Sequence, residues 1–304
     1  IKTEEDKKFV EPIVLQGVLK YFLKFFNEVK PDVVAFAFEG SENWRVDYTK
    51  DKEKWCTGVG YKANRNNIDP AVRALHKKTM IVVREFMEQF TSCVVIRHEM
   101  LEGDDCIAGY VHKHANNGDT VVCVSGDRDF LQLYQYGDKF VLLNPENGEN
   151  RTLVEDCGVD DWEFFIFLKC IRGDKGDNVP SAFPRIRHTR IVEAFNDPVV
   201  REQVMSSEIV SEGENKTLVR TRFFENKTMM DLSNQPDHVK QVITRVIDQA
   251  DNNVGKFCIV KFAAECKRLN LPSVAKNIHS YARMFASKKN EVKTRENTYE
   301  FDWG

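Results

Sequence analysis

Apolar residues recur along this chain with a spacing that alternates between helical and strand-like. Residues 12–29 place apolar side chains three and four positions apart, which is the spacing of one helix face, and Pro12 lies near the start of this segment. Residues 32–38 are short, β-branched and aromatic, with turn residues on both sides, so they predict a buried strand. Residues 41–68 are polar and irregular, which is uncommon in a connection of this length unless it has a function.

The same alternation continues beyond residue 68. Asp69 and Pro70 are suited to the N-cap and the first position of a helix. The further predicted elements are a strand at 93–96, a helix from about 103 to 117, strands at 120–125 and 140–143, and a helix at 160–171. This order predicts an α/β fold with a mostly parallel central sheet flanked by helices. Ligands bind at the carboxyl ends of strands in such sheets, and Glu39 and Asp127 both follow predicted strands.

Beyond residue 180 the pattern is helical. Segments around 188–195, 238–249 and 257–269 have helical spacing, and strand alternation is not evident. We therefore predict an α/β domain over residues 1–180 and a smaller α-helical domain over residues 181–304 that ends in a charged tail.

Composition is that of a soluble globular protein, with 42% hydrophobic and 30% charged residues in 304. The longest apolar run, residues 33–38, is far too short to cross a membrane. The eight cysteines include no C-x-x-C pair, which favours a reducing cytoplasm. The net charge of −3 does not exclude nucleic acid, because basic stretches occur at 62–73 and 185–190 and a metal could neutralise an acidic cluster.

Three acidic motifs fall between residues 101 and 178. They contain the carboxylates Glu102, Asp104, Asp105, Asp127, Asp129, Asp174 and Asp177. Two carboxylates about 4 Å apart repel by roughly 4 kcal/mol at an effective dielectric of about 20. If the fold brings them together, they must take up protons or bind cations, and oxygen ligands favour magnesium, calcium or manganese over zinc.

Each motif also has a structural interpretation. Glu102, Asp104 and Asp105 can cap the helix that they open. One of the two aspartates beside Arg128 can pair with it, and residues 174–177 can form a simple turn. The three motifs together predict a divalent-metal site, which is not an EF-hand because the twelve-residue ligand spacing does not occur. Residues 61–65 are either a solvated face or a contact to one phosphate.

Four sequence blocks resemble the signature motifs of the 5′-nuclease (flap endonuclease) family and occur in the family's order. They are Tyr61-Lys62-Ala63-Asn64-Arg65, Glu102-Gly103-Asp104-Asp105, Ser125-Gly126-Asp127-Arg128-Asp129 and Gly173-Asp174-Lys175-Gly176-Asp177-Asn178-Val179-Pro180. The second half is also similar to the ribonuclease H of T-even-type bacteriophages, at residues 189–197 and 222–232. The likeness covers most of residues 30–285.

The resemblance implies a PIN-like nuclease core and a 5′→3′ exonuclease and flap endonuclease. Its substrates would be 5′ flaps, forks and RNA–DNA primers of lagging-strand replication, and its cofactor two magnesium ions, with manganese as a substitute. It implies a metal site made of Glu39, Glu102, Asp104, Asp105, Asp127, Asp129, Asp174 and Asp177. It implies catalytic roles for Lys62, Arg65, Asp104, Asp127 and Asp129, with Lys62 and Arg65 engaging the scissile phosphate below an arch at 41–68. The expected DNA-binding residues are Trp44, Arg45, Tyr61 (stacked on a base), Lys62, Arg65, Arg128, Lys175, Arg185, Arg187 and Arg190.

Three departures from the family pattern stand out. The family opens with a strand that carries an aspartate ligand, and the sequence from Ile1 onward does not contain it, so either this strand lies upstream of Ile1 or the first metal site is incomplete. Glu39 stands where the family usually has aspartate, one methylene shorter. Where the family has a Pro-Gly-Ile-Gly hairpin, this chain has Pro184-Arg185-Ile186-Arg187. We therefore expect the glycine-dependent turn to be lost and no potassium ion to be bound there. We expect the arginines to contact phosphate directly instead.

The first two departures keep a second function open, that of a structure-selective protein that holds DNA flaps or forks without cutting them. A haloacid-dehalogenase-type phosphatase fits less well, because its Asp-x-Asp motif follows an early strand and residues 127–129 come too late. The tail at 287–304 is either a flexible end or a docking segment for a sliding clamp or single-stranded-DNA-binding protein. We expect a monomer that has no membrane association and acts in the cytoplasm, which would be the host's if the chain is a phage protein.

Overall fold

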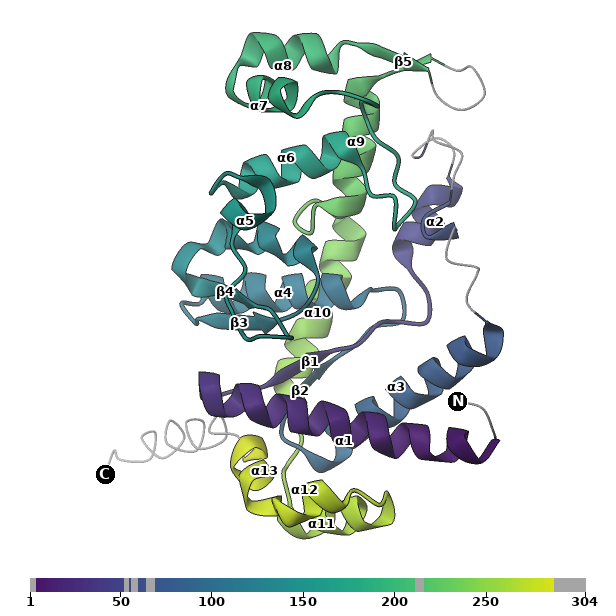
Figure 1. Ribbon diagram of the computed structural model, residues 1–304, viewed down its shortest axis with the longest axis vertical. Helices are drawn as coiled ribbons and strands as arrows, with labels where there is room; N and C mark the ends of the chain where they lie inside the picture. Colours follow the sequence, from purple (N-terminus) through teal and green to yellow (C-terminus); the bar gives the residue numbers. More distant parts are fainter. Residues whose placement is uncertain (1–3, 52–54, 56–59, 64–68, 211–215, 287–304) are drawn as a thin grey trace, which may run out of the picture. The chain divides into compact units, whose positions relative to one another are not determined.

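The structure is a computed structural model that describes residues 4–51, 55, 60–63, 69–210 and 216–286 (Figure 1). The chain divides into two compact units, each with its own hydrophobic core. The first unit comprises residues 1–38, 68–97 and 246–304, and the second comprises residues 39–67 and 98–245. The predicted boundary at residue 180 falls inside the second unit, and the division into domains 1–180 and 181–304 stays a prediction.

The first unit is built on two helices and a pair of short strands. Helix α1 (Glu4–Val29) packs against α3 (Pro70–Phe90), and β1 (Ala35–Ala37) pairs in parallel with β2 (Val94–Ile96). Asp69 caps α3 as predicted, since its side chain accepts a hydrogen bond from the backbone N–H of Ala71 at 2.8 Å. Helix α1 begins before the predicted start, so that Pro12 lies within it.

Three further helices complete this unit: α11 (Ile259–Arg268), α12 (Pro272–Lys276) and α13 (Ile278–Phe285). Aromatic rings fill the space between them and α3. The ring of Phe262 lies 5.5 Å from that of Phe86 and 5.5 Å from that of Phe285, within the usual range for edge-to-face and tilted aromatic pairs. The division between the two units, at residues 245 and 246, falls within helix α10 (Asp237–Asn252).

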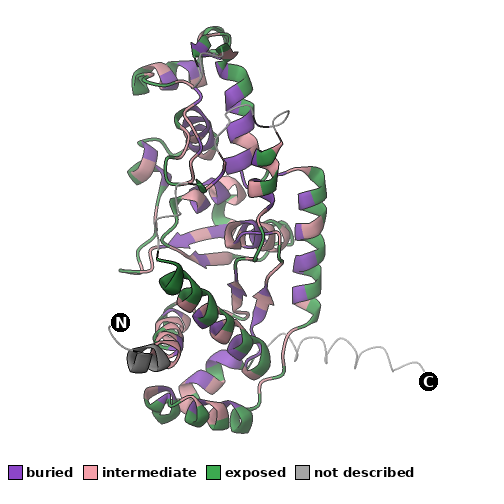
Figure 2. Ribbon diagram, turned by 90° about the vertical axis from the view of Figure 1, so that its right-hand side faces the viewer, coloured by how far each residue is buried: buried purple, intermediate pink, exposed green. Residues whose placement is uncertain are grey.

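The second unit has a parallel strand pair, β3 (Val121–Val124) and β4 (Phe140–Leu143), joined by the 3₁₀ segment η2 (Arg128–Lys139). Its helices are α2 (Trp44–Lys50), α4 (Gly103–Asn116), α5 (Leu153–Cys157), α6 (Trp162–Arg172), α7 (His188–Asn196), α8 (Pro198–Met205) and α9 (Val219–Met230). Helices α4, α6 and α9 each carry several buried residues. Figure 2 shows helices on which buried and exposed positions alternate. Within the described residues, no helix combines the length and the apolar character needed to cross a membrane.

The α/β fold is confirmed, with three corrections to the predicted details. The four parallel strands form two separate two-stranded sheets rather than one central sheet. The second half contains an antiparallel hairpin, β5 (Glu208–Val210) and β6 (Lys216–Leu218), although no strand was predicted there. Each of its strands has three residues and is largely exposed, so it leaves little alternation to detect. The supposedly irregular segment 41–68 contains helix α2.

Candidate active site

The first acidic cluster lies at the start of α4, where two of its carboxylates act as caps. Glu102 is the N-cap residue, and its backbone N–H donates to Oδ2 of Asp105 at 3.1 Å within a capping box. Asp104 lies in the first turn, where the helix dipole favours negative charge. A side chain at Gly103 would come within 3.7 Å of Cγ of Glu39, so Glu39 lies beside this turn. The residues that cap α4 therefore also bring carboxylates together at the start of this helix.

Arg45 of α2 is enclosed against this cluster. Its guanidinium donates to Oε2 of Glu102 at 2.9 Å, to both oxygens of Asp105 at 2.8 and 2.9 Å, and to the carbonyl of Met229 at 2.8 Å. The indole N–H of Trp44 also donates to Oδ2 of Asp105, at 3.0 Å. Only 2% of Arg45 and 3% of Trp44 are exposed. The start of α2 is thus fixed to the start of α4 by buried, charge-assisted hydrogen bonds.

This arrangement bears on three predicted roles. Trp44 and Arg45 were predicted to contact DNA, and in this structure both side chains are buried and engaged with protein groups. Asp105 was predicted to bind metal, and both of its oxygens accept hydrogen bonds from Arg45. These three roles stay predictions. Burial would raise the pKa of Asp105, but the charge and hydrogen bonds of Arg45 and the bond from Trp44 hold it below its ordinary value.

Tyr61 connects the first acidic cluster with the third. Its hydroxyl lies 3.0 Å from Oε2 of Glu102 and 2.8 Å from Oδ2 of Asp177. Burial and the neighbouring Glu102 carboxylate raise the pKa of Tyr61 well above its ordinary value, so the hydroxyl keeps its proton and donates. The residue is only 7% exposed, and its predicted stacking on a base stays a prediction.

Lys62 follows in a left-handed backbone conformation, with φ 54°. Its backbone N–H donates to the carbonyl of Asp177 at 2.9 Å, and the side-chain amide of Asn178 donates to the carbonyl of Gly60 at 2.8 Å. The ammonium group forms an ion pair with Glu102 and lies 3.9 Å from Oδ2 of Asp177. Positive φ is uncommon outside glycine, and here the strained residue carries the cation that faces the carboxylates.

The third cluster is a tight turn after α6, as its structural interpretation predicted. Oδ1 of Asp174 accepts hydrogen bonds from the backbone N–H groups of Gly176, at 2.8 Å, and Asp177, at 3.2 Å. Gly173 has φ 69°, and a Cβ there would lie 2.5 Å from the carbonyl oxygen of Val179. Only glycine fits at that position, because any side chain would meet both backbone strain and a clash.

The second cluster follows strand β3. Asp127 is the N-cap of η2, and its Oδ1 accepts a hydrogen bond from the backbone N–H of Asp129 at 2.8 Å. Arg128 does not pair with either neighbouring aspartate, as one interpretation had it, but forms an ion pair with Asp156. Asp129 forms an ion pair with Lys169 of α6, a residue that sequence reasoning did not single out.

The three clusters lie close enough together to influence one another's charge. The pKa of Asp104 is raised to about 7. Burial makes the largest contribution, the charges of Asp127, Glu102 and Asp129 add to it, and the charge of Arg45 opposes it. Burial also raises the pKa of Asp129, with contributions from Asp127 and Asp174 that Lys169 opposes. Carboxylates that disfavour one another's ionisation form an environment that attracts cations.

A hard divalent cation fits this site by donor chemistry, since carboxylates are the ligands that magnesium and manganese prefer. In the described part of the chain, no three Asp, Glu, His or Cys side chains converge to coordinate one ion. The ammonium groups of Lys62 and Lys169 lie among the carboxylates instead. The site therefore has the composition of a metal site, with two lysines positioned among its ligands.

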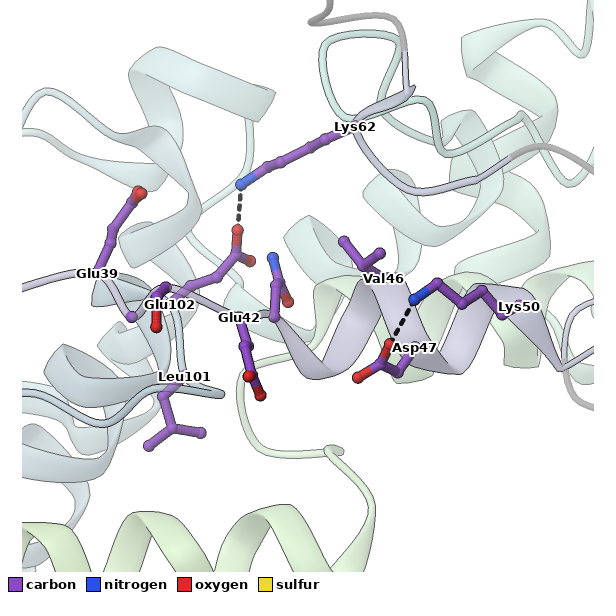
Figure 3. A pocket seen from close by; sticks show the side chains of 11 residues that line it. Glu39, Glu42, Val46, Asp47, Lys50, Lys62, Leu101 and Glu102 are labelled. Atoms are coloured by element: carbon purple, nitrogen blue, oxygen red, sulfur yellow. Dashed lines mark hydrogen bonds and ion pairs between the residues drawn. The ribbon is translucent and has the colours of Figure 1, made fainter. Parts of the chain in front are cut away.

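A cavity of about 600 Å³ opens beside the first cluster (Figure 3). Glu39, Glu102 and Lys62 line it together with α2 and the turn that precedes α2. The charged residues of its wall are Glu39, Glu42, Asp47, Lys50, Lys62 and Glu102. The cavity gives solvent and solutes access to the carboxylate edge.

The remaining predicted DNA-binding residues lie around the third cluster and the start of α7. Lys175, Arg185 and Arg187 are exposed, while Arg190 donates to Glu193 at 3.0 Å and to Gln203 at 2.8 Å. Arg185 has φ 62°, so the prediction that the glycine-dependent turn is lost was wrong: arginine adopts the left-handed conformation. Arg65 lies outside the described residues.

Sequence reasoning missed two residues that hold the second cluster. Lys169 is the one charged residue in the apolar run 164–171, and that isolation was a usable signal. Gln132 is fully buried; its side-chain amide donates to the carbonyl of Asp129 at 2.8 Å, and its oxygen accepts from the backbone N–H of Leu232 at 2.7 Å. Gln132 also stands among apolar residues, between Leu131 and Leu133, and this isolation was a usable signal too.

Comparison with known proteins agrees with this geometry. Residues 4–159, about half of the chain, match the family described as 5′-3′ exonuclease, N-terminal resolvase-like domain, and the chain belongs to that family. It is 30% identical over 179 residues to a DNA polymerase I of Caldicellulosiruptor bescii. This match covers 55% of this chain and 19% of the polymerase. It is 26% identical over 169 residues to the ribonuclease H of Enterobacteria phage T4, which covers 50% of each protein. The chain thus spans half or less of the length of these relatives.

Solved structures share the fold. A complex of the bacteriophage T5 flap endonuclease with DNA and metal ions has a TM-score of 0.56 at 18% identity, over 78% of this chain and 91% of that one. The T5 5′-exonuclease with bound zinc has a TM-score of 0.55 at 19% identity, over 78% of this chain and 90% of that one. This likeness supports the α/β architecture with its additional helices.

Proposed function

We propose that this protein is a divalent-metal-dependent 5′ nuclease. It would act as a 5′→3′ exonuclease and flap endonuclease that hydrolyses phosphodiesters in 5′ flaps and RNA–DNA primers during lagging-strand replication. The observation that carries the proposal is the convergence of three carboxylate clusters: the Lys62 ammonium lies between Glu102 and Asp177, and the Lys169 ammonium lies between Asp129 and Asp174. The polymerase, ribonuclease H and flap endonuclease relatives support the same reaction class.

The metal-binding residues of the proposal come from all three clusters. They are Glu39, Glu102, Asp104, Asp127, Asp129, Asp174 and Asp177, and the ions would be two Mg²⁺, with Mn²⁺ as a substitute. When bound, such ions supply Lewis-acid stabilisation of a phosphate and lower the pKa of a bound water. T5 relatives bound to metal ions support this assignment.

The chain's own residues would bind and orient the reacting phosphate. The side chain of Lys62 is 20% exposed at the carboxylate edge, so its ammonium can reach a phosphate oxygen and neutralise the charge that develops there. The Tyr61 hydroxyl lies within hydrogen-bond distance of Glu102 and Asp177, and Arg45 donates to the same oxygen of Glu102 that the hydroxyl contacts. Arg65 would assist Lys62.

DNA binding would use the exposed cations near the third cluster. Lys175, Arg185 and Arg187 are placed to contact phosphates, which position a duplex without reading its sequence. The partners in this proposal are DNA with 5′ flaps or forks and RNA–DNA duplexes, bound by a monomer in the cytoplasm. A clamp or single-stranded-DNA-binding protein would dock on residues 287–304, which lie outside the described residues.

The test is cleavage of a 5′-flap DNA by the Asp129→Asn variant in Mg²⁺, compared with Asp156→Asn. Asp129 belongs to the second cluster and pairs with Lys169, whereas Asp156 lies outside the three acidic motifs and pairs with Arg128. The expected result is a loss of about 100-fold or more for Asp129→Asn, since even outer-shell changes cost 10- to 100-fold, and little change for Asp156→Asn. Full cleavage by Asp129→Asn would contradict the proposal, and intact flaps with wild-type protein would favour a non-cleaving binding protein.

A further inference from the structure

Two lysines occupy equivalent positions in the carboxylate site, each between two acidic clusters. The Lys62 ammonium pairs with Glu102 of the first cluster and lies 3.9 Å from Oδ2 of Asp177 in the third. The Lys169 ammonium pairs with Asp129 of the second cluster and lies 3.9 Å from Oδ2 of Asp174 in the third. Each cation therefore spans carboxylates that come from distant parts of the sequence.

Lys169 is not an ordinary surface lysine. It lies in α6 among residues that are almost all buried, and Leu168 and Cys170 on either side are 7% and 0% exposed. Only 17% of its own side chain is exposed. A lysine is rarely buried to this extent unless its charge is paired, so the carboxylates of Asp129 and Asp174 are the reason for its position.

A metal ion and an ammonium group compete for the same carboxylate oxygen. Magnesium binds oxygen at about 2.0–2.1 Å, and an ammonium group that donates to the same oxygen would lie close enough to the ion for the two positive charges to repel each other. A metal ion that binds Asp129 through Oδ1 is therefore opposed by the Lys169 ammonium, which donates to that oxygen.

We propose that Lys169 is a built-in counter-cation of the metal-free protein. It neutralises the Asp129 and Asp174 carboxylates until a divalent ion displaces it, and it thereby sets the affinity of this position for metal. The displacement couples metal binding to a side-chain movement in α6. This inference rests on the proposed metal-dependent function and adds a residue that controls how readily the site is loaded.

The test is Mn²⁺ binding by calorimetry to the full chain and to Lys169→Met, which keeps the long apolar stem and removes the charge. The expected result is a Mn²⁺ affinity higher by about tenfold, within the range usual for coupled binding events. In EDTA the variant should unfold at a lower temperature than wild type, and saturating Mn²⁺ should reduce that difference. A variant that folds only with Mn²⁺ present would also support the inference.

Two matched variants separate displacement from general charge. Lys169→Arg keeps a cation and should bind Mn²⁺ about as weakly as wild type. Arg172→Met removes an exposed cation from the same helix, one whose partner is His188, and should leave the affinity nearly unchanged. Equal affinities of wild type and Lys169→Met, with equal stability in EDTA, would overturn the inference and leave the proposed function intact. No Mn²⁺ binding by wild type would overturn both.

Discussion

Both carboxylate oxygens of Asp105 accept hydrogen bonds from Arg45, at 2.8 and 2.9 Å, and their side chains are only 0% and 3% exposed. The same guanidinium holds Glu102 at 2.9 Å. A buried ion pair contributes little net stability when intact, but removing one partner leaves an uncompensated charge in the interior. The link between α2 and α4 therefore depends on both partners being present.

Replacement of Arg45 by methionine should destabilise the protein by about 3–5 kcal/mol, because Asp105 would be left buried and unpaired. The measurement is the free energy of unfolding from chemical denaturation. Lys50→Met is the matched control in the same helix: Lys50 pairs with Asp47 on the surface, where an ion pair is worth about 0.2–1 kcal/mol. Equal losses of unfolding free energy in the two variants would show that the buried ion pair contributes no more to stability than the surface pair.

Replacement of Tyr61 by phenylalanine removes the hydroxyl that connects Glu102 with Asp177 and keeps the ring. The expected result is a kcat on 5′-flap DNA lower by about tenfold or more with little change in KM, since groups that orient metal ligands carry effects of this size. Tyr136→Phe is the control, because that hydroxyl contacts His112 at the surface. An unchanged kcat would show that the hydroxyl does not orient Glu102 and Asp177 for the reaction.

The stability of the metal-free protein should depend on pH through Asp104. Burial raises the pKa of this carboxyl from 3.8 to about 7 in the folded chain, so the folded state binds the proton more tightly than the unfolded state. Stability is therefore lost as the pH rises between these two values, by up to about 4 kcal/mol. In EDTA, Asp104→Asn should unfold at a higher temperature than wild type at pH 8 and at a similar temperature near pH 4.

Added Mg²⁺ should remove the advantage of Asp104→Asn at pH 8, because the wild-type carboxylate then gains a cation. Thermal unfolding followed at several pH values with and without Mg²⁺ provides the comparison. A difference between the two proteins that does not vary with pH would contradict a raised pKa at Asp104.

Arg185 provides a test in which stability and DNA binding should change in opposite directions. Replacement by glycine relieves a positive φ of 62°, which should stabilise the fold by about 1 kcal/mol, and removes one phosphate contact. Arg187→Gly is the control, since Arg187 has φ −72° and gains nothing from glycine. Both variants should reduce the salt dependence of duplex binding by about one phosphate, and only Arg185→Gly should raise the melting temperature.

Most of the fold was predictable because its signals are local. Asp69 and Pro70 mark the start of α3, and the apolar residues of 140–143 mark β4 with its observed bounds. The separation of the strands into two sheets was not predictable, because strand pairing depends on contacts between segments far apart in the chain. The hairpin of β5 and β6 escaped detection because its strands have only three residues each, and most of these residues are exposed.

The site was predictable to the level of its acidic motifs and no further. Carboxylates in three short clusters are visible in the sequence, whereas the partner of each one is a tertiary property. Arg45 and Tyr61 were placed on the DNA because cations and aromatic rings near a nuclease motif usually face a substrate, yet both are buried against Glu102. Lys169 shows the converse: an isolated cation in an apolar helix is evidence of a buried charge partner.

The most direct test of the whole account is cleavage of a 5′-end-labelled flap DNA by the wild-type chain, with Mg²⁺ and with EDTA. Three carboxylate clusters that attract divalent cations predict cleavage near the base of the flap in Mg²⁺ and an intact substrate in EDTA. A flap that is bound but never cut at any Mg²⁺ concentration would contradict the account and leave a DNA-binding protein in its place.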